Sequence, residues 1–277
     1  MTAHVCGVLG DPVAHSLSPV LHRAAYQAHD LDWTYDAHRV GAGGLQQFLA
    51  GLDESWRGLS LTMPLKREAM GLVDTLSDVA RVSSAVNTVV IEHQGGSRVL
   101  HGDNTDVPGA VAALRERGGA EGPQRATILG GGATATSVGL ALLSMGVREI
   151  DLLVRTPERA TETRDVLVGW AADARVRVLS LDAVVVPGDV VVSTVPAAAQ
   201  GEALVERLAG AAVVFDVVYD PWPTPLVAAC DGVVVSGLDL LVHQATFQFE
   251  LFTGRPAPLA VMRAAGEQAL AARNAGR

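Results

Sequence analysis

Short apolar runs alternate with longer segments of helical periodicity along the chain, and this alternation predicts the elements of the fold. The first third predicts a strand, a helix, a strand, a helix and a strand, over residues 4–10, 19–29, 33–40, 44–52 and 58–63. Two further runs, 86–92 and 98–101, are joined by Gln94-Gly95-Gly96-Ser97, which indicates a hairpin. This part of the chain therefore predicts an α/β sheet with one antiparallel edge.

A regular series of strands and helices follows. After a helix over 107–117, we expect strands over 126–129, 149–154, 176–181, 189–194, 212–217 and 232–236, and helices over 135–145, 157–173 and 200–209. Valine runs at 184–186, 190–192 and 233–235 are typical of strands buried on both faces of a parallel sheet. The series predicts a doubly wound parallel sheet, and the segments 238–251 and 260–273 predict two C-terminal helices.

Composition excludes several classes of protein. The 277-residue chain is 49% hydrophobic, enough for one large or two medium domains, and its net charge of −9 is not typical of a nucleic-acid-binding protein. No apolar run reaches the ~18 residues of a membrane span, and the N-terminus lacks a signal-peptide pattern. Cys6 and Cys230 are expected to be buried thiols. We therefore expect a cytoplasmic protein without metal, membrane or nucleic-acid partners, either a monomer or a homodimer.

A glycine-rich turn lies between the predicted strand 126–129 and the helix that follows it. Its sequence is Gly130-Gly131-Gly132-Ala133-Thr134-Ala135. Gly130 would permit the tight turn, Gly132 would let backbone N–H groups approach a pyrophosphate, and Ala135 would allow close packing of the helix on the strand. The turn therefore predicts a dinucleotide site at a helix N-terminus.

The next strand bears on the choice of dinucleotide. An NAD site would place an acidic residue at the end of this strand, whereas Asp151 lies inside it. The strand instead runs into Arg155, Thr156 and Arg159, which are suited to a 2′-phosphate, although the arginines would also serve as solvated residues at a helix start. This arrangement favours NADP.

Two polar residues follow apolar, strand-like runs in the first third of the chain. Lys66 ends Ser60-Leu61-Thr62-Met63-Pro64-Leu65-Lys66, and Asp103 lies in Gly102-Asp103-Asn104-Thr105-Asp106. A lysine and an aspartate at strand ends are suited to moving a proton to or from a substrate oxygen. Together with a dinucleotide site, they predict hydride transfer.

Several motifs resemble, in order, those of the shikimate dehydrogenase family. They are Ser16-Leu17-Ser18-Pro19, Ser60 to Lys66, Ser84-Ala85-Val86-Asn87-Thr88, Gly102 to Asp106 and Val154-Arg155-Thr156, and the match extends to Gln244. The resemblance implies reversible NADPH-dependent reduction of 3-dehydroshikimate to shikimate, in aromatic amino-acid biosynthesis. It implies two domains, a discontinuous substrate-binding α/β domain of residues 1–105 plus 238–277, with a mostly parallel sheet, and a doubly wound Rossmann-type NADP-binding domain of residues 106–237.

The resemblance also implies roles for individual residues. Lys66 would be the general acid and base, with Asp103 beside it. The substrate carboxylate and ring hydroxyls would be bound by Ser16, Ser18, Thr62, Asn87, Tyr219 and Gln244. The cofactor would be bound by Gly130, Gly131, Gly132, Ala133, Thr134, Ala135, Arg155, Thr156, Arg159, Thr194, Val218, Gly237 and Leu241.

Some of these residues also have structural interpretations. Ser18 is placed to cap the helix that follows, with Pro19 in its first turn, and Asp106 is placed to cap another helix. Asn87 would alternatively bond backbone at a strand end. Ser60 stands where many family members have asparagine, so we do not expect it to contact substrate directly.

Other functions remain open at this point. One alternative is a quinate or aminoshikimate dehydrogenase of the same superfamily, which Ser18 and Arg155 disfavour. A second is a non-catalytic NADPH-binding module, and the presence of both Lys66 and Asp103 disfavours it.

Overall fold

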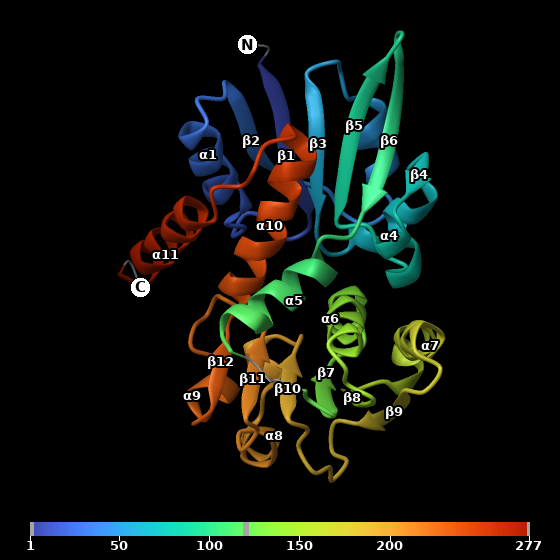
Figure 1. The fold of residues 1–277 in the computed structure, drawn as a ribbon, viewed down its shortest axis with the longest axis vertical. Helices are drawn as coiled ribbons and strands as arrows, with labels where there is room; N and C mark the ends of the chain where they lie inside the picture. The colour runs from blue at the N-terminus through green and yellow to red at the C-terminus, as the bar shows by residue number, and fades with distance from the viewer. Residues whose placement is uncertain (1–2, 119–121, 276–277) are drawn as a thin grey trace. The chain divides into compact units, whose positions relative to one another are not determined.

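The computed structural model describes residues 3–118 and 122–275. The chain forms two compact units, each with its own sheet (Figure 1). Unit 1 comprises residues Met1–Thr105 and Val242–Arg277, and unit 2 comprises Asp106–Leu241. No helix in the described ranges has the length and apolar character needed to cross a membrane.

Unit 1 contains a mixed, mostly parallel sheet. Its strands are β1 (His4–Gly10), β2 (Trp33–Arg39), β3 (Trp56–Leu61), β4 (Thr75–Leu76), β5 (Thr88–Gln94) and β6 (Ser97–Asp103), in the spatial order β2-β1-β3-β5-β6-β4. The pairs β1–β2, β1–β3 and β4–β6 are parallel, whereas β5 is antiparallel to both β3 and β6. The predicted hairpin is confirmed: Gly95 and Gly96 have φ values of 57° and 82°, as a two-residue turn requires.

The side chains of β3 alternate between two different faces of this sheet. The helices of the unit are α1 (Ser18–Ala28), α2 (Leu45–Ala50), α3 (Leu65–Glu68), α4 (Asp78–Ser83), α11 (Leu259–Ala275) and the part of α10 (Gly237–Thr253) from Val242 onward. Leu59 and Leu61 pack in one core with residues of α2, α3 and α4. On the other face, a Cβ added to Gly58 would meet the ring of Phe252, on α10, at 2.2 Å, so the helix approaches the strand closely.

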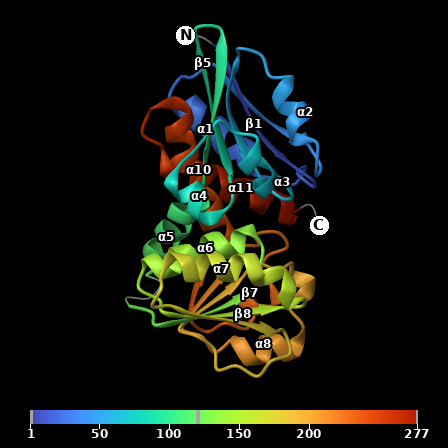
Figure 2. The same ribbon diagram turned by 90° about the vertical axis from the view of Figure 1, so that its right-hand side faces the viewer.

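Unit 2 is a doubly wound, parallel six-stranded sheet. Its strands are β7 (Arg125–Leu129), β8 (Glu149–Val154), β9 (Arg175–Ser180), β10 (Val190–Ser193), β11 (Val213–Asp216) and β12 (Val233–Val235), in the order β12-β11-β10-β7-β8-β9. The helices are α5 (Asp106–Glu116), α6 (Ala133–Ser144), α7 (Thr161–Trp170), α8 (Glu202–Leu208) and α9 (Pro225–Ala228). Figure 2 shows α6 and α7 on one face of the sheet and α8 on the other. The strand order reverses between β7 and β10, and ligands of such sheets bind at the carboxyl ends of the strands at this point.

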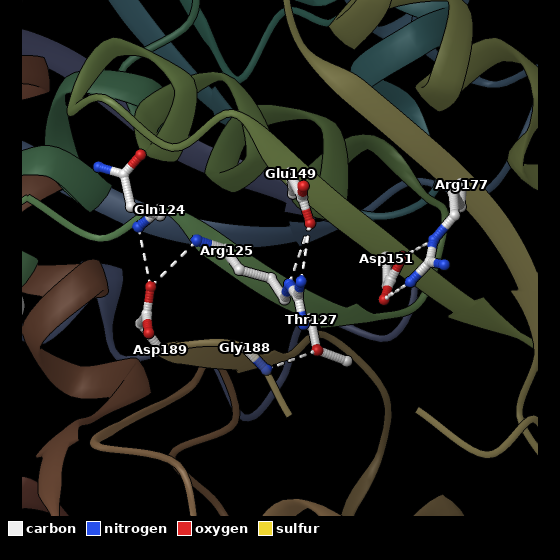
Figure 3. Close-up of polar contacts among 8 residues, drawn as sticks. All are labelled: Gln124, Arg125, Thr127, Glu149, Asp151, Arg177, Gly188 and Asp189. Carbon is white, nitrogen blue, oxygen red and sulfur yellow. Dashed lines mark hydrogen bonds and ion pairs between the residues drawn. The ribbon is translucent and has the colours of Figure 1, made fainter. Parts of the chain in front are cut away.

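Polar contacts cross the unit 2 sheet at β7, β8 and β9 (Figure 3). Arg177 on β9 donates two hydrogen bonds of 2.6 Å to the carboxylate of Asp151, which lies opposite it on β8. Arg125 and Glu149 form a similar pair between β7 and β8, at 3.0 Å. Asp151 is therefore occupied inside the sheet, away from the strand end where a ribose would bind.

Asp189 joins β7 to the segment that precedes β10. Its Oδ2 accepts the backbone N–H groups of Gln124 and Arg125 at 2.8 and 3.1 Å (Figure 3). The hydrogen bond from Arg125, and after it the one from Gln124, lowers the pKa of Asp189 below its ordinary value.

Several local predictions are wrong. Residues 184–186 form no strand: Val184 and Val186 are 93% and 72% exposed, and only Val185 packs against the core. A strand cannot continue here because Pro187 and Gly188 follow, and Gly188 lies against the backbone of Ala126, where a Cβ would come within 2.7 Å. The predicted helix 157–173 divides into a 3₁₀ turn, Pro157–Ala160, and α7.

Ser18 does not cap α1. The helix begins at Ser18 itself, and Leu17 is the residue before its first turn. The hydroxyl oxygen of Ser16 accepts the backbone N–H of Ser18 at 3.2 Å. The residue before the helix provides no side-chain cap, and the bond to the first helical N–H comes from Ser16.

The two cysteines differ in burial. Cys6 is buried, and burial raises the pKa of its thiol to about 12. Cys230 is only half-buried, so the prediction of two buried thiols is correct for Cys6 alone.

A buried histidine on α1 should make the stability of unit 1 depend on pH. His22 is fully buried and stacks on Tyr35 with ring centroids 4.2 Å apart. Burial lowers the pKa of His22 to about 3, and contact with Gln248 opposes this lowering only in part. Within the described residues, neither ring nitrogen has a hydrogen bond of normal geometry. The stability provided by neutral His22 is present above about pH 6.5 and is lost as the pH falls toward 3.

We expect His22→Phe to weaken this acid dependence. Between pH 7.5 and 4.5, wild-type protein should lose roughly 2–3 kcal/mol more of its free energy of unfolding than the variant, as measured by urea titration at each pH. His15→Gln, at an exposed position, is the control and should follow the wild type. An identical pH dependence in His22→Phe and the wild type would contradict the prediction.

Candidate active and cofactor sites

Three predicted site residues of unit 1 are joined by backbone hydrogen bonds. The N–H of Val86 donates to the carbonyl of Lys66 at 2.8 Å, and the N–H of Asn87 donates to the carbonyl of Asp103 at 3.1 Å. The carbonyl of Asn87 in turn accepts from Leu61 at 2.7 Å, at the end of β3. Lys66, Asn87 and Asp103 are thus brought to one edge of the sheet from three distant parts of the sequence.

The chain has 21 basic residues besides histidine, and Lys66 is the only lysine among them. It is half-buried in α3, where the buried Leu65 precedes it and the half-buried Arg67 follows it. Arginine keeps its proton in proteins, whereas a lysine ammonium can lose its own. The use of lysine here, where every other basic position has arginine, therefore indicates a role in proton transfer.

The carboxylate of Asp103 is held in a fixed orientation. Its Oδ1 accepts the hydroxyl of Ser77 at 2.5 Å and the backbone N–H of Asn104 at 2.7 Å. Ser77 also caps α4 by accepting the N–H of Ala80 at 3.1 Å. The helix and the carboxylate are positioned by the same hydroxyl group, and no described residue donates to Oδ2 of Asp103.

The amide of Asn87 is also oriented by its neighbours. Its Oδ1 accepts the backbone N–H of Thr105 at 2.8 Å, so its Nδ2 points toward Thr105 Oγ1 at 3.0 Å and Gln244 Oε1 at 3.5 Å. The structural interpretation of Asn87, a bond to backbone, is therefore correct. It does not exclude a ligand role, because the same bond fixes the direction in which the amide group is presented.

The remaining predicted substrate residues are distributed over both units. Ser16 and Thr62 are half-buried and Ser18 is buried, all in unit 1. Tyr219, half-buried, follows β11 in unit 2.

The glycine turn of unit 2 is packed against the end of β10. Gly130 has φ of 110°, and a Cβ there would meet Thr194 Oγ1 at 2.2 Å. Thr194 donates this hydroxyl to the carbonyl of Leu129 at 2.7 Å. Only glycine fits at position 130, on grounds of both conformation and space.

The N-terminus of α6 is suited to an anion. Gly132 precedes the helix, no side chain caps it, and the space where a Cβ of Gly132 would lie is open to 4 Å. The first N–H groups of the helix and its dipole therefore point at an accessible volume. Ala133 and Thr134 are half-buried around it, and Ala135 is buried under the helix as predicted.

The end of β8 presents positive charge. Arg155, Thr156 and Arg159 are all exposed, and within the described residues neither arginine takes part in an ion pair. These residues fit a 2′-phosphate, and the α6 N-terminus fits a pyrophosphate, so the residues present fit NADP.

The segments after β11 and β12 contain three more of the predicted cofactor residues, Val218, Gly237 and Leu241. A Cβ on Gly237 would come within 2.2 Å of the carbonyl oxygen of Val217, which places Gly237 against the segment that contains Val218. Leu241 follows one turn later in α10 and is half-buried.

A buried polar cluster anchors these loops. Asp216 accepts hydrogen bonds from Gln200 Nε2 and Thr224 Oγ1, each at 2.7 Å, and from the N–H of Val218 at 3.0 Å. Burial raises the pKa of Asp216, and these bonds oppose the rise. Gln200 also accepts the N–H of Leu226 at 3.0 Å, so its amide joins three segments.

Some residues that shape the two sites were missed in the sequence. Besides Gln200, they include Ser77, which donates to the carboxylate of Asp103, and Thr163. The hydroxyl of Thr163 donates to the carbonyl of Gly131 at 2.8 Å. Ser77 had a signal, since a serine before Asp78 is typical of a helix cap. Thr163 had none, because its contact depends on how α7 packs. No group of three or more histidine, cysteine, aspartate or glutamate side chains within the described ranges is arranged to hold a metal ion.

The chain is similar to known proteins over almost its whole length. The sequence profile of the "Shikimate dehydrogenase substrate binding domain" matches residues 8–89, and that of the "Shikimate 5'-dehydrogenase C-terminal domain" matches 237–265. The NADP(+) shikimate dehydrogenase of Moorella thermoacetica is 36% identical over 282 residues, which cover 97% of this chain and 94% of that protein.

Solved structures give the same result. The shikimate dehydrogenase of Mycobacterium tuberculosis matches with a TM-score of 0.85 and 37% identity, over 96% of this chain and 99% of that one. A quinate dehydrogenase of Corynebacterium glutamicum, solved with NAD, matches with a TM-score of 0.86 and 27% identity, over 96% and 99% of the two chains. On the identity and coverage of the Moorella relative and the assembled motifs of both units, the chain belongs to the shikimate dehydrogenase family.

Proposed function

We propose that the protein is an NADP-dependent shikimate dehydrogenase, an oxidoreductase that reversibly reduces 3-dehydroshikimate to shikimate. The observation that carries this proposal is the backbone linkage of Lys66, Asn87 and Asp103 at one sheet edge, in a chain 36% identical to an NADP(+) shikimate dehydrogenase. We assign residues 1–105 plus 238–277 to substrate binding and 106–237 to the dinucleotide. A cytoplasmic monomer or homodimer that acts on small molecules is the form we expect.

Lys66 acts as the general acid and base. NADPH supplies the hydride when bound, and the Lys66 ammonium gives a proton to the carbonyl oxygen as that oxygen gains negative charge. In the reverse direction, neutral Lys66 takes the proton from the substrate hydroxyl. Asp103, held through Oδ1 by Ser77 and Asn104, orients the ammonium and accepts from the same hydroxyl.

Polar side chains select the rest of the ring. Ser16, Ser18 and Tyr219 bind the carboxylate, and Thr62, Asn87 and Gln244 bind ring hydroxyls. An analogue that lacks a matching hydroxyl would leave a buried polar group of the protein without a partner, which costs affinity.

The cofactor residues divide by the part of NADP that they meet. Gly130, Gly131, Gly132, Ala133, Thr134 and Ala135 meet the pyrophosphate. Arg155, Thr156 and Arg159 bind the 2′-phosphate, and Thr194, Val218, Gly237 and Leu241 line the nicotinamide end. Asp151 lies inside β8, paired with Arg177, and the residue that follows the strand is Arg155 rather than a carboxylate, which supports NADP over NAD.

The second candidate is a quinate dehydrogenase. The similarity to the Corynebacterium quinate dehydrogenase, solved with NAD, is the observation in its favour. Ser18 and Arg155 weigh against it, the first on substrate and the second on cofactor.

Lys66 variants test the proton-transfer role. We expect Lys66→Ala and Lys66→Arg both to lower kcat by roughly 10²-fold or more, because arginine keeps the charge but cannot exchange the proton. NADPH binding, followed by fluorescence, should be retained. Arg81→Ala, an exposed cation on α4, is the control and should keep normal turnover. Substantial activity in Lys66→Arg would exclude Lys66 as the acid–base group.

Arg155 tests the choice of cofactor. Arg155→Ala should raise KM for NADP by roughly 10–100-fold, through loss of a charge-assisted bond to phosphate, and should leave KM for NAD nearly unchanged. Arg164→Ala, an exposed arginine on α7 paired with Asp165, is the matched control. Equal losses for NADP and NAD in Arg155→Ala would show that Arg155 does not recognise the 2′-phosphate.

Initial rates at 340 nm test the overall assignment. Shikimate, quinate and an aminoshikimate are each combined with NADP and with NAD. We expect shikimate with NADP to give the highest kcat/KM. A preference for quinate with NAD would favour the second candidate, and absence of turnover despite NADPH binding would favour a non-catalytic module.

A further inference from the structure

A chain of buried hydrogen bonds crosses the sheet of unit 1 on the face covered by α10. Ser60 and Thr88 lie directly opposite each other on β3 and β5. The amide of Gln248 bridges their hydroxyls: Ser60 donates to Oε1 at 2.7 Å, and Nε2 donates to Thr88 at 2.9 Å. All three residues are at most 5% exposed, so these bonds form away from solvent.

A single backbone carbonyl sets the direction of this chain. Nε2 of Gln248 lies 3.2 Å from the carbonyl oxygen of Asn87, which only accepts hydrogen bonds. The amide is therefore oriented with Oε1 toward Ser60, and the Ser60 hydroxyl must be the donor. The remaining contact of Ser60 is from Tyr35, whose hydroxyl donates to it at 2.6 Å.

The chain begins at Tyr35. Tyr35 is fully buried, and it gives its single hydroxyl proton to Ser60. The Ser60 oxygen is thereby occupied as an acceptor, and its own proton goes to Gln248.

The other end of the chain reaches two predicted substrate residues. Thr88, which accepts from Gln248, donates its own hydroxyl to Asn87 Oδ1 at 2.7 Å. The bond reinforces the orientation that Thr105 gives the Asn87 amide, with Nδ2 toward Gln244. Each group from Ser60 to Thr88 accepts from one neighbour and donates to the next, and this directional order ends at Asn87.

We propose that Tyr35, Ser60 and Gln248 are positioning residues that fix which polar atoms Asn87 presents to the substrate, and so contribute to its discrimination. The inference rests on the proposed substrate role of Asn87. Ser60 acts inside the protein: both of its hydrogen bonds are to buried side chains, and its side chain is not a ligand contact. The loss of the Ser60 hydroxyl would leave Oε1 of Gln248 without this donor, so the amide that holds Thr88, and through it Asn87, would be less firmly fixed.

Kinetics of five variants test this proposal. Ser60→Ala and Gln248→Met should raise KM for shikimate by about 10-fold while KM for NADP changes less than twofold. Tyr35→Phe keeps the Ser60–Gln248 bond and should raise KM for shikimate only severalfold. Ser60→Thr, which keeps the hydroxyl, should restore a KM close to that of the wild type. Asn87→Ala, measured in parallel, tests the substrate role on which the inference rests.

The outcomes separate the two proposals. If Asn87→Ala raises KM for shikimate but Ser60→Ala and Gln248→Met do not, even with a lower Tm, the three residues are purely structural and the positioning role is wrong. If Asn87→Ala leaves KM unchanged, the substrate role of Asn87 fails first. If Ser60→Ala does not fold, the Tyr35→Phe variant decides, because it removes only the hydroxyl oxygen and keeps the ring. An unchanged KM for shikimate in Tyr35→Phe would overturn the proposal.

Discussion

Two consecutive backbone amides, those of Val86 and Asn87, hold the substrate side of the molecule together. One donates to Lys66 and the other to Asp103, so a single short segment before β5 fixes the backbone at both proposed proton-transfer residues. Side chains on loops would otherwise need many contacts to reach the same precision. Here the sheet supplies it, because the carbonyl of Asn87 is also bonded to the end of β3.

The need to satisfy buried polar groups extends this order through the sheet. A buried amide or hydroxyl without a partner costs about 1–3 kcal/mol, so each group in the chain from Tyr35 to Asn87 constrains its neighbours. The carbonyl of Asn87 serves twice, as the acceptor for β3 and as the group that orients Gln248. In unit 2, Gln200 plays a comparable part, since its amide bonds Asp216, Ser193 and the N–H of Leu226.

Periodicity predicted most strands and long helices because their burial repeats along the sequence. The doubly wound sheet, the hairpin and the glycine turn all depend on local signals, and all are confirmed. The short helices α3, α4 and α9 were missed, because at most six residues give only a weak periodic signal. The prediction of a strand at 184–186 was wrong because it followed composition alone. Three valines are typical of a buried strand, but the proline and glycine that follow end the segment before it can pair.

Site residues divide in the same way between local and long-range signals. Motifs identified Lys66, Asp103 and the glycine turn, whereas the partners that orient them come from distant segments. Asp151 shows why position within an element matters more than residue type. An acidic residue on β8 would suggest NAD by composition, yet Asp151 lies inside the strand, directly opposite Arg177 on β9, and pairs with it there. The residues exposed after the end of β8 include Arg155 and Arg159. Two guanidinium groups are suited to a phosphate, with which they form strong charge-assisted hydrogen bonds.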